Sequence, residues 1–222
     1  HFEKNTNLPI VAGNVSFYNQ SGDNAIPSSP MIGCFGKNID VNKSIQNSFQ
    51  SKGSVVFLLG GSNYAMGGSV VADLLAIDNN DVHRFSNKQF STLLNSLISL
   101  ESRELILSSR VVTRGGLAVS LCKMSFQNNI GIKVRLAKEK FSERLFNENL
   151  SILLEVHGAD ARNVEKILEK KDIPFDIIGS TCIEKTITIN DKINLSINEA
   201  KNIWEQSLRE KPMSLVLFEV RD

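Results

Sequence analysis

From residue 54 onward, segments with a strand pattern alternate irregularly with segments of helical pattern. Ser54 to Leu59 is a run rich in Val, Phe and Leu, which is typical of a strand buried on both faces. Ser86 and Gln89 have the spacing of a capping box and predict the start of a helix. The apolar stripe of this helix, which we expect in the core, consists of Phe90, Leu93, Leu94, Leu97 and Ile98. The alternation predicts an α+β fold, a sheet with helices packed on it.

Similar patterns continue towards the C-terminal end. Runs or alternations of apolar residues predict strands at 130–136, 151–156, 183–189 and 215–220. One further helix is expected over 117–124, directly after Gly115-Gly116, and another is capped by Asp160 and stops before Pro174. Ser196 and a capping-box glutamate open the last helix, which we expect to pack Ile203, Trp204 and Leu208.

The polar segment from Lys37 to Ser54 is our candidate domain boundary. Before it, Leu8 to Val11 predicts a short buried strand that runs into Gly13-Asn14. Met31 to Phe35 predicts a second strand, after a turn at 21–24. We therefore expect a short N-terminal region followed by a larger domain.

The charge balance argues against nucleic-acid binding. The 222 residues include 25 Lys and Arg against 24 Asp and Glu, a formal net charge of +1, so there is no strong basic excess to hold phosphates. No apolar run approaches the roughly 18 residues of a membrane span, and the polar first ten residues show no signal peptide. We expect neither a nucleic-acid partner nor a membrane.

The three cysteines, Cys34, Cys122 and Cys182, lie far apart and form no Cys-x-x-Cys pair. This spacing argues against a zinc site or a disulfide framework and favours a reducing, cytoplasmic location. The chain opens with His1-Phe2-Glu3 and no Met. We therefore expect it to be an excised piece of a longer protein.

Three glycine-bearing turns border predicted strands or helices: Gly13-Asn14, the stretch Gly60 to Ser69, and Gly115-Gly116. Backbone N–H groups at such turns can hold phosphate, particularly where a helix begins. The Walker and dinucleotide-binding patterns are both absent. A tight turn is the more common use of a glycine pair, and on the pattern alone it is the favoured interpretation.

Asn14 and Ser16 are two residues apart and would point the same way from a strand. An amide oxygen can ligate a hard cation, and a hydroxyl can bind a phosphate or sugar oxygen. On the residues alone, a polar strand end with satisfied hydrogen bonds is the favoured alternative.

The remaining polar residues give weaker signals. No serine or cysteine is placed to suggest a triad with His83 or His157. Charged pairs such as Glu143-Arg144 are typical of a solvated face.

Several motifs follow one another along the chain in the order found in one known family. Pro9 to Asn19 reads Pro-Ile-Val-Ala-Gly-Asn-Val-Ser-Phe-Tyr-Asn. This run resembles the stretch Pro-Val-Val-x-Gly-Asn-Val-Ser-x-Tyr-Asn of phosphoribosylformylglycinamidine synthase of purine biosynthesis. Ala25 to Gly33 is similar to Ala-Ile-x-Pro-Thr-Pro-Val-Ile-Gly, and Gly115 to Leu121 to Gly-Gly-Leu-Ala-Val-Ala-Leu. Leu145 to Glu148 is similar to Leu-Phe-Ser-Glu. Residues 173–179 fit the family's C-terminal strand, and the helix from Ser196 fits its last helix.

The resemblance implies a fold. Residues 46–222 would be a C-terminal domain of the aminoimidazole ribonucleotide synthase-like type, a mixed sheet with packed helices. Residues 1–45 would be the C-terminal tail of that superfamily's N-terminal-type domain. The superfamily also includes selenophosphate synthetase, and in the long synthase subunit the two-domain unit occurs twice. This chain would then be the C-terminal part of the second copy.

The resemblance also implies an activity. ATP phosphorylates the amide oxygen of formylglycinamide ribonucleotide, and ammonia from a glutaminase subunit or domain displaces the phosphate to give the amidine. By position in the motif, Gly13 would contact ATP, Asn14 a magnesium ion and Ser16 the substrate. The family's catalytic histidines belong to the first copy, so we expect this chain to be inactive without the rest of its protein.

The sequence departs from the family pattern at two places. Thr113-Arg114 stands where the family has Ser-Asp, and Gly61-Ser62-Asn63-Tyr64 lacks the acid of Gly-Gly-Ser-Glu-Tyr. A non-catalytic nucleotide-binding or assembly module of the same superfamily is therefore an alternative. Another alternative is a selenophosphate synthetase-like kinase, against which the run Asn14 to Asn19 argues.

Overall fold

The computed structural model describes residues 9–15, 20–25, 31–60, 64–77, 81–82 and 86–210, without the side chains of 21 and 207–210. The chain divides into two compact units, residues 1–44 and 45–222. Each unit is considered by itself below.

The first unit contains a small hairpin and one turn of helix. Strands β1 (Gln20–Ser21) and β2 (Asn24–Ala25) pair antiparallel around the predicted turn. The 3₁₀ helix η1 (Val41–Lys43) begins at Asp40, whose side chain accepts a hydrogen bond from the Asn42 amide.

The two strands predicted in the first unit are not present in its described part. Residues 9–11 and 31–35 have no regular secondary structure, and Leu8 lies outside the described residues. Their apolar side chains are exposed; Met31, for example, is 97% exposed. The prediction was wrong because an apolar run becomes a strand only where a partner strand supplies hydrogen bonds, and no described strand of this unit pairs with these residues.

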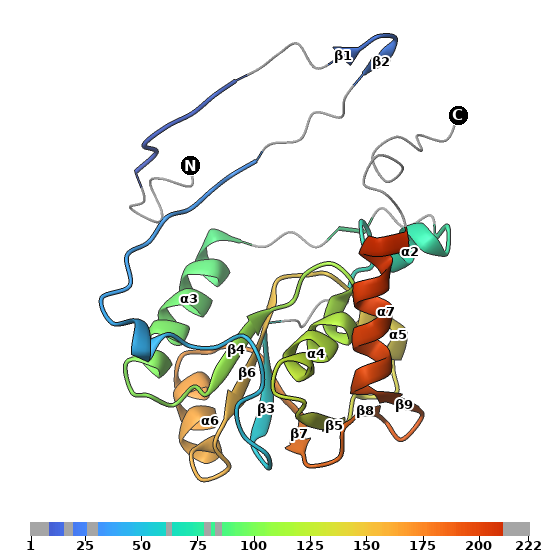
Figure 1. Ribbon diagram of the computed structural model, residues 1–222. Helices are drawn as coiled ribbons and strands as arrows, with labels where there is room; N and C mark the ends of the chain where they lie inside the picture. Colours follow the sequence, from blue (N-terminus) through green and yellow to red (C-terminus); the bar gives the residue numbers. More distant parts are fainter. Residues whose placement is uncertain are drawn as a thin grey trace. The chain divides into compact units, whose positions relative to one another are not determined.

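The second unit is a seven-stranded sheet covered by helices (Figure 1). Its elements are, in chain order, β3 (Val55–Gly60), α2 (Val70–Leu74), α3 (Asn87–Glu101), β4 (Ser108–Val111), α4 (Gly116–Phe126), β5 (Gly131–Val134), α5 (Phe141–Phe146), β6 (Ser151–Val156), α6 (Ala161–Lys170), β7 (Phe175–Cys182), β8 (Thr186–Ile189), β9 (Ile193–Ser196) and α7 (Ile197–Glu210).

The strand order is β4-β6-β3-β7-β5-β8-β9. All neighbours are antiparallel except β5 and β8, which are parallel, so the sheet is mixed. β3 is paired on both sides, by β6 and β7. This central position explains why its sequence is a continuous apolar run. The α+β fold with a mixed sheet and packed helices is confirmed.

Two cores lie on opposite faces of the sheet. Alternate residues of β3 enter different cores: Phe57 packs with α3 and α6, and Val56 packs with α4, α5 and α7. Figure 1 shows α3 and α6 on one face of the sheet and α4 and α7 on the other. The helices therefore bury both faces.

The helix starts follow the predicted signals only in part. The Ser86–Gln89 capping box of α3 is present in both directions. Asp160 lies at the N-cap of α6, but its side chain makes no capping hydrogen bond. α6 ends before Pro174, as predicted. The strand predicted over 215–220 lies outside the described residues.

Two helices bury less than their apolar patterns predict. In α3, Leu93 is buried but Leu94 and Ile98 are exposed. In α7, Ile203 and Trp204 are exposed, whereas Ile197 and Ala200 enter the core. The reason is geometric, because a helix buries only the stripe that faces the sheet, and these side chains lie beyond that stripe. No described helix is long and apolar enough to cross a membrane.

Candidate functional site

Gly13 and Asn14, the predicted ATP and magnesium residues, lie in the first unit and are exposed. A Cβ added to Gly13 would meet nothing within 4 Å. Ser16, the predicted substrate residue, lies outside the described residues. Among the described residues of the first unit, no other functional group is placed beside Gly13 and Asn14. The roles of Gly13, Asn14 and Ser16 therefore stay predictions.

A carboxylate in the second unit joins three of the sequence motifs. Glu148 Oε1 accepts hydrogen bonds from the amide of Val70, at 2.9 Å, and from the amide of Gly115, at 2.8 Å. Val70 opens α2 directly after the glycine-rich stretch ending at Ser69, and Gly115 is the N-cap of α4. Helix N-termini favour negative charge. Glu148 therefore takes the place that an external anion could otherwise occupy at these two helix starts.

Gly115 and Gly116 form a tight turn, which confirms the favoured interpretation of the pair. Both have left-handed backbone conformations, with φ of 86° and 67°. A Cβ on Gly116 would lie 2.7 Å from Phe146 Cα, so the backbones pass too closely for a side chain. The Gly116 amide donates to the carbonyl of Thr113 at 2.9 Å, and the Gly115 amide donates to Glu148. Neither amide is available to a phosphate.

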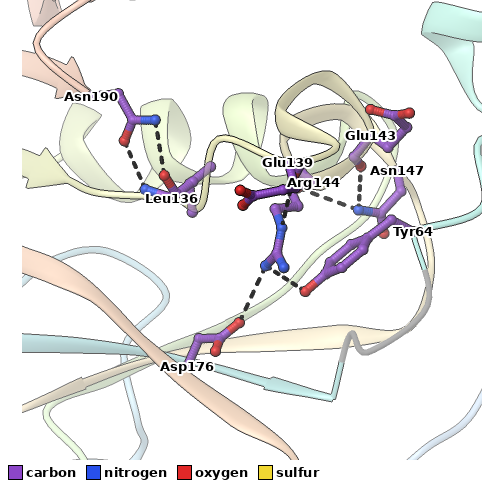
Figure 2. A network of polar contacts seen from close by, with 8 residues as sticks. All are labelled: Tyr64, Leu136, Glu139, Glu143, Arg144, Asn147, Asp176 and Asn190. Atoms are coloured by element: carbon purple, nitrogen blue, oxygen red, sulfur yellow. Dashed lines mark hydrogen bonds and ion pairs between the residues drawn. The ribbon is translucent and has the colours of Figure 1, made fainter.

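A second polar cluster, consisting of Tyr64, Arg144 and Asp176, lines a pocket of about 210 Å³. Figure 2 shows the three side chains turned towards one another. The other walls of the pocket are formed by Leu58, Gly60, Pro174 and Phe175. The pocket thus lies where β3 ends and β7 begins, two segments far apart in sequence that pair in the sheet.

Arg144 is held in place from three directions. Its Nη1 donates to the Tyr64 hydroxyl at 2.6 Å, and its Nε donates to the carbonyl of Glu139 at 3.2 Å. Nη1 lies 3.7 Å from Asp176 Oδ2, and the guanidinium carbon lies 4.2 Å from the centre of the Tyr64 ring. The Arg144 side chain is only 24% exposed. The interpretation of Glu143-Arg144 as a solvated face was therefore wrong for Arg144.

Burial of the Tyr64 hydroxyl raises its pKa above the usual 10, an effect that Arg144 opposes and Asp176 reinforces. The phenol therefore stays protonated at neutral pH. It accepts from Arg144 and keeps its own proton to donate.

Short polar contacts fix the chain around the pocket. Asn149 Nδ2 donates to the carbonyl of Ala65 at 3.2 Å, which ties the residue after Tyr64 to the α5–β6 connection. On the other side, Asn190 bonds both the amide and the carbonyl of Leu136, at 2.7 and 2.9 Å (Figure 2). These contacts fix the segment after Tyr64 and the segment between β5 and α5.

The described residues contain no group of three or more His, Cys, Asp and Glu side chains that could hold a metal ion. Asn14 by itself offers one neutral oxygen. A complete magnesium site is therefore not assembled from the part of the chain that the structure describes. The three cysteines are free.

Residues 51–192 match the model of a protein family described as "AIR synthase related protein, C-terminal domain". The chain belongs to this family. The match covers all of the central sheet except its last strand, together with the pocket and both glycine-bearing turns of the second unit.

Curated relatives extend the similarity beyond that domain. The chain is 33% identical over 208 residues to phosphoribosylformylglycinamidine synthase subunit PurL of Picrophilus torridus, covering 90% of this chain and 26% of that protein. It is 29% identical over 208 residues to the same subunit of Thermus thermophilus, covering 91% of this chain and 28% of that protein. The chain thus spans about a quarter of the length of these relatives.

Solved structures share the fold. PurL of Thermotoga maritima, solved in complex with ATP, superposes with a TM-score of 0.58 at 12% identity, over 72% of this chain and 27% of that one. The same protein solved in complex with FGAR gives a TM-score of 0.59 at 13% identity, over 72% and 30%. At these identities the likeness shows the fold alone.

The sequence reasoning missed Arg144 and Asp176 as members of a site. One signal was available: Arg144 directly precedes the motif Leu145 to Glu148, and Tyr64 lies within the glycine-rich stretch. No local pattern indicates that Asp176 faces them, because the sheet alone brings β7 to this position.

Proposed function

We propose that this chain is part of an ATP-dependent ligase that converts formylglycinamide ribonucleotide and ammonia to formylglycinamidine ribonucleotide in purine biosynthesis. The observation that carries the proposal is the 33% identity to a PurL subunit over 90% of this chain. The family motifs at 115–121 and 145–148 also fall within residues 51–192, which match the family model. In the second unit, Glu148 joins two of these motif regions directly.

The proposed substrates and partners follow from the same relatives. PurL has been solved with ATP and with FGAR, which supports both as ligands of the whole protein that contains this chain. A glutaminase subunit or domain would supply the ammonia, as the family resemblance implies. We place the protein in the cytoplasm, in keeping with its free cysteines.

Within this function, Gly13 would approach ATP through its backbone, Asn14 would provide one oxygen to magnesium, and Ser16 would bind the substrate. Magnesium would offset charge on the phosphates. Residues 1–45 would be the tail of an N-terminal-type domain and 46–222 the C-terminal domain. The division of the chain between Ser44 and Ile45 supports that boundary. The chain alone would be inactive.

The test uses the natural full-length protein with formylglycinamide ribonucleotide, magnesium ATP and ammonium, and measures ADP release. We expect release that requires both the ribonucleotide and ammonium and that falls at least a hundredfold in Asn14→Ala. Asn24→Ala, a matched change at an exposed hairpin residue of the same unit, should leave the rate unchanged. Circular dichroism checks that both variants are folded.

Other outcomes separate the alternatives. No ADP release by the folded wild-type protein would contradict the ligase and favour a non-catalytic module, in keeping with Arg114 at the α4 turn. Normal ADP release by Asn14→Ala would be consistent with the ligase proposal but would show that Asn14 is not part of the active site.

A further inference from the structure

The pocket beside Tyr64, Arg144 and Asp176 has no role in the function proposed above. Its charged groups are one cation and one anion, so their charges cancel. A free phosphate would be attracted by Arg144 and repelled by Asp176 in the same space. The pocket is therefore suited to a neutral polar ligand rather than to an anion.

Arg144 and Asp176 retain hydrogen-bonding capacity. Their closest nitrogen and oxygen lie 3.7 Å apart, which is longer than a hydrogen bond. Arg144 has five N–H donors, of which contacts to Tyr64 and Glu139 use two. Asp176 has a side chain 58% exposed. One donor and one acceptor thus lie side by side at the pocket.

Arg144 is also preorganised for recognition. The Glu139 carbonyl, the Tyr64 hydroxyl and the Tyr64 ring all fix its guanidinium, so little rotamer entropy remains to be lost on binding. Leu58, which lies opposite Asp176 on the same face of the sheet, and Pro174 supply apolar surface for a flat ring. A volume of about 210 Å³ is below that of pockets for whole drug-sized ligands and suits a single ring system.

We infer that this pocket binds the base of an adenine nucleoside or nucleotide. Adenine presents an acceptor, N7, next to a donor, the N6 amino group. Arg144 would donate to N7, Asp176 would accept from N6, and the ring would lie against Leu58. The inference uses residues of the second unit alone and does not depend on the proposed ligase activity.

The experiment is calorimetric titration of the full chain with adenosine, which carries no phosphate. We expect binding that is lost with N6,N6-dimethyladenosine, because the methyl groups remove the donor. Asp176→Asn should weaken adenosine binding about tenfold or more, since it removes a charged acceptor. Arg144→Lys should have a similar effect, because lysine cannot reproduce the fixed planar group.

A matched control exists in segments that follow strands of the same sheet. Arg135 and Asp191 also lie 3.7 Å apart, but their side chains are 86% and 80% exposed and line no part of this pocket. Asp191→Asn should leave adenosine binding unchanged. Thermal melts confirm that all variants are folded.

Three results would each overturn the inference. Absence of adenosine binding by the folded wild-type chain at millimolar concentration would show that there is no base site. Equal binding of dimethyladenosine would exclude recognition of the amino group. Equal affinity in wild type and Asp176→Asn would place any adenosine elsewhere. Because formylglycinamide ribonucleotide and ammonia are absent, none of these results bears on the ligase proposal.

Discussion

The two ends of β6 use a glutamate in different ways. Near its C-terminal end, Glu155 is fully buried and accepts four hydrogen bonds of 2.7–2.9 Å. The donors are the amides of Gln50 and Ser51 and the hydroxyls of Ser54 and Ser108. Before its N-terminal end, Glu148 is only half-buried and accepts two amides through a single oxygen.

The difference separates a structural end of the sheet from a candidate binding end. At Glu155 the polar groups satisfy one another and leave no capacity for a ligand. At the other end, Ser151 of β6 pairs with Gly60, and Gly60 borders the pocket of Tyr64 and Arg144. Here donors and acceptors remain available. The sheet is therefore closed at one end and open to recognition at the other.

The comparison predicts its largest effect at Glu155. Glu155→Ala should lower the free energy of unfolding by about 3–5 kcal/mol, because four donors, most of them buried or half-buried, lose their acceptor at once. Glu205→Ala is the control: Glu205 is 49% exposed and 4.0 Å from Lys201. Its loss should cost less than about 1 kcal/mol. Urea denaturation measures both, and equal losses would contradict the structural role of Glu155.

An intermediate effect is expected at the turn beside Glu148. Gly116→Ala should cost about 2–4 kcal/mol, since a methyl group would meet the backbone of Phe146 and would force an unfavourable positive φ. At Gly68, φ is also positive, at 74°, but a Cβ would meet nothing within 4 Å. Gly68→Ala should therefore cost only about 1 kcal/mol. Similar unfolding free energies for the two variants would rule out the close backbone approach at Gly116.

The smallest effect is predicted for Glu148→Gln, which keeps the shape and removes the charge. We expect a loss of about 0.5–1.5 kcal/mol, because the amide oxygen still accepts hydrogen bonds while the interaction with two helix N-termini weakens. Hydrogen exchange should accelerate at the amides of Val70 and Gly115 but not at that of Gln50. A loss of unfolding free energy as large as that of Glu155→Ala would contradict the distinction between the two ends of β6.

Local features of the fold were predictable from sequence. The predicted strand 151–156 has the bounds of β6, and α4 begins at the glycine pair as expected. The Ser86–Gln89 capping box was predicted from two residues three positions apart. These features depend on periodicity or on hydrogen bonds between near neighbours, so a short window of sequence contains their cause.

The site was less predictable. Tyr64 and Arg144 are 80 residues apart, and their hydrogen bond exists only because the glycine-rich stretch and α5 meet at one end of the sheet. The apolar run Met31 to Phe35 has the pattern of a strand, but the sequence does not show whether a second strand is available to form hydrogen bonds with it. No local pattern indicates the role of Glu155, because its carboxylate joins segments up to 105 residues apart.

The sequence by itself determined the α+β class, the central apolar strand, the helix start at Ser86 and the tight turn at Gly115-Gly116. Each depends on the conformational preferences of a few adjacent residues. Tertiary structure alone decided which polar groups are buried together: Glu155 with its four donors, and Arg144 with Tyr64 and Asp176. Burial changes what a charge can do, because leaving water makes every unmet hydrogen bond costly, and only the complete fold determines which groups leave water.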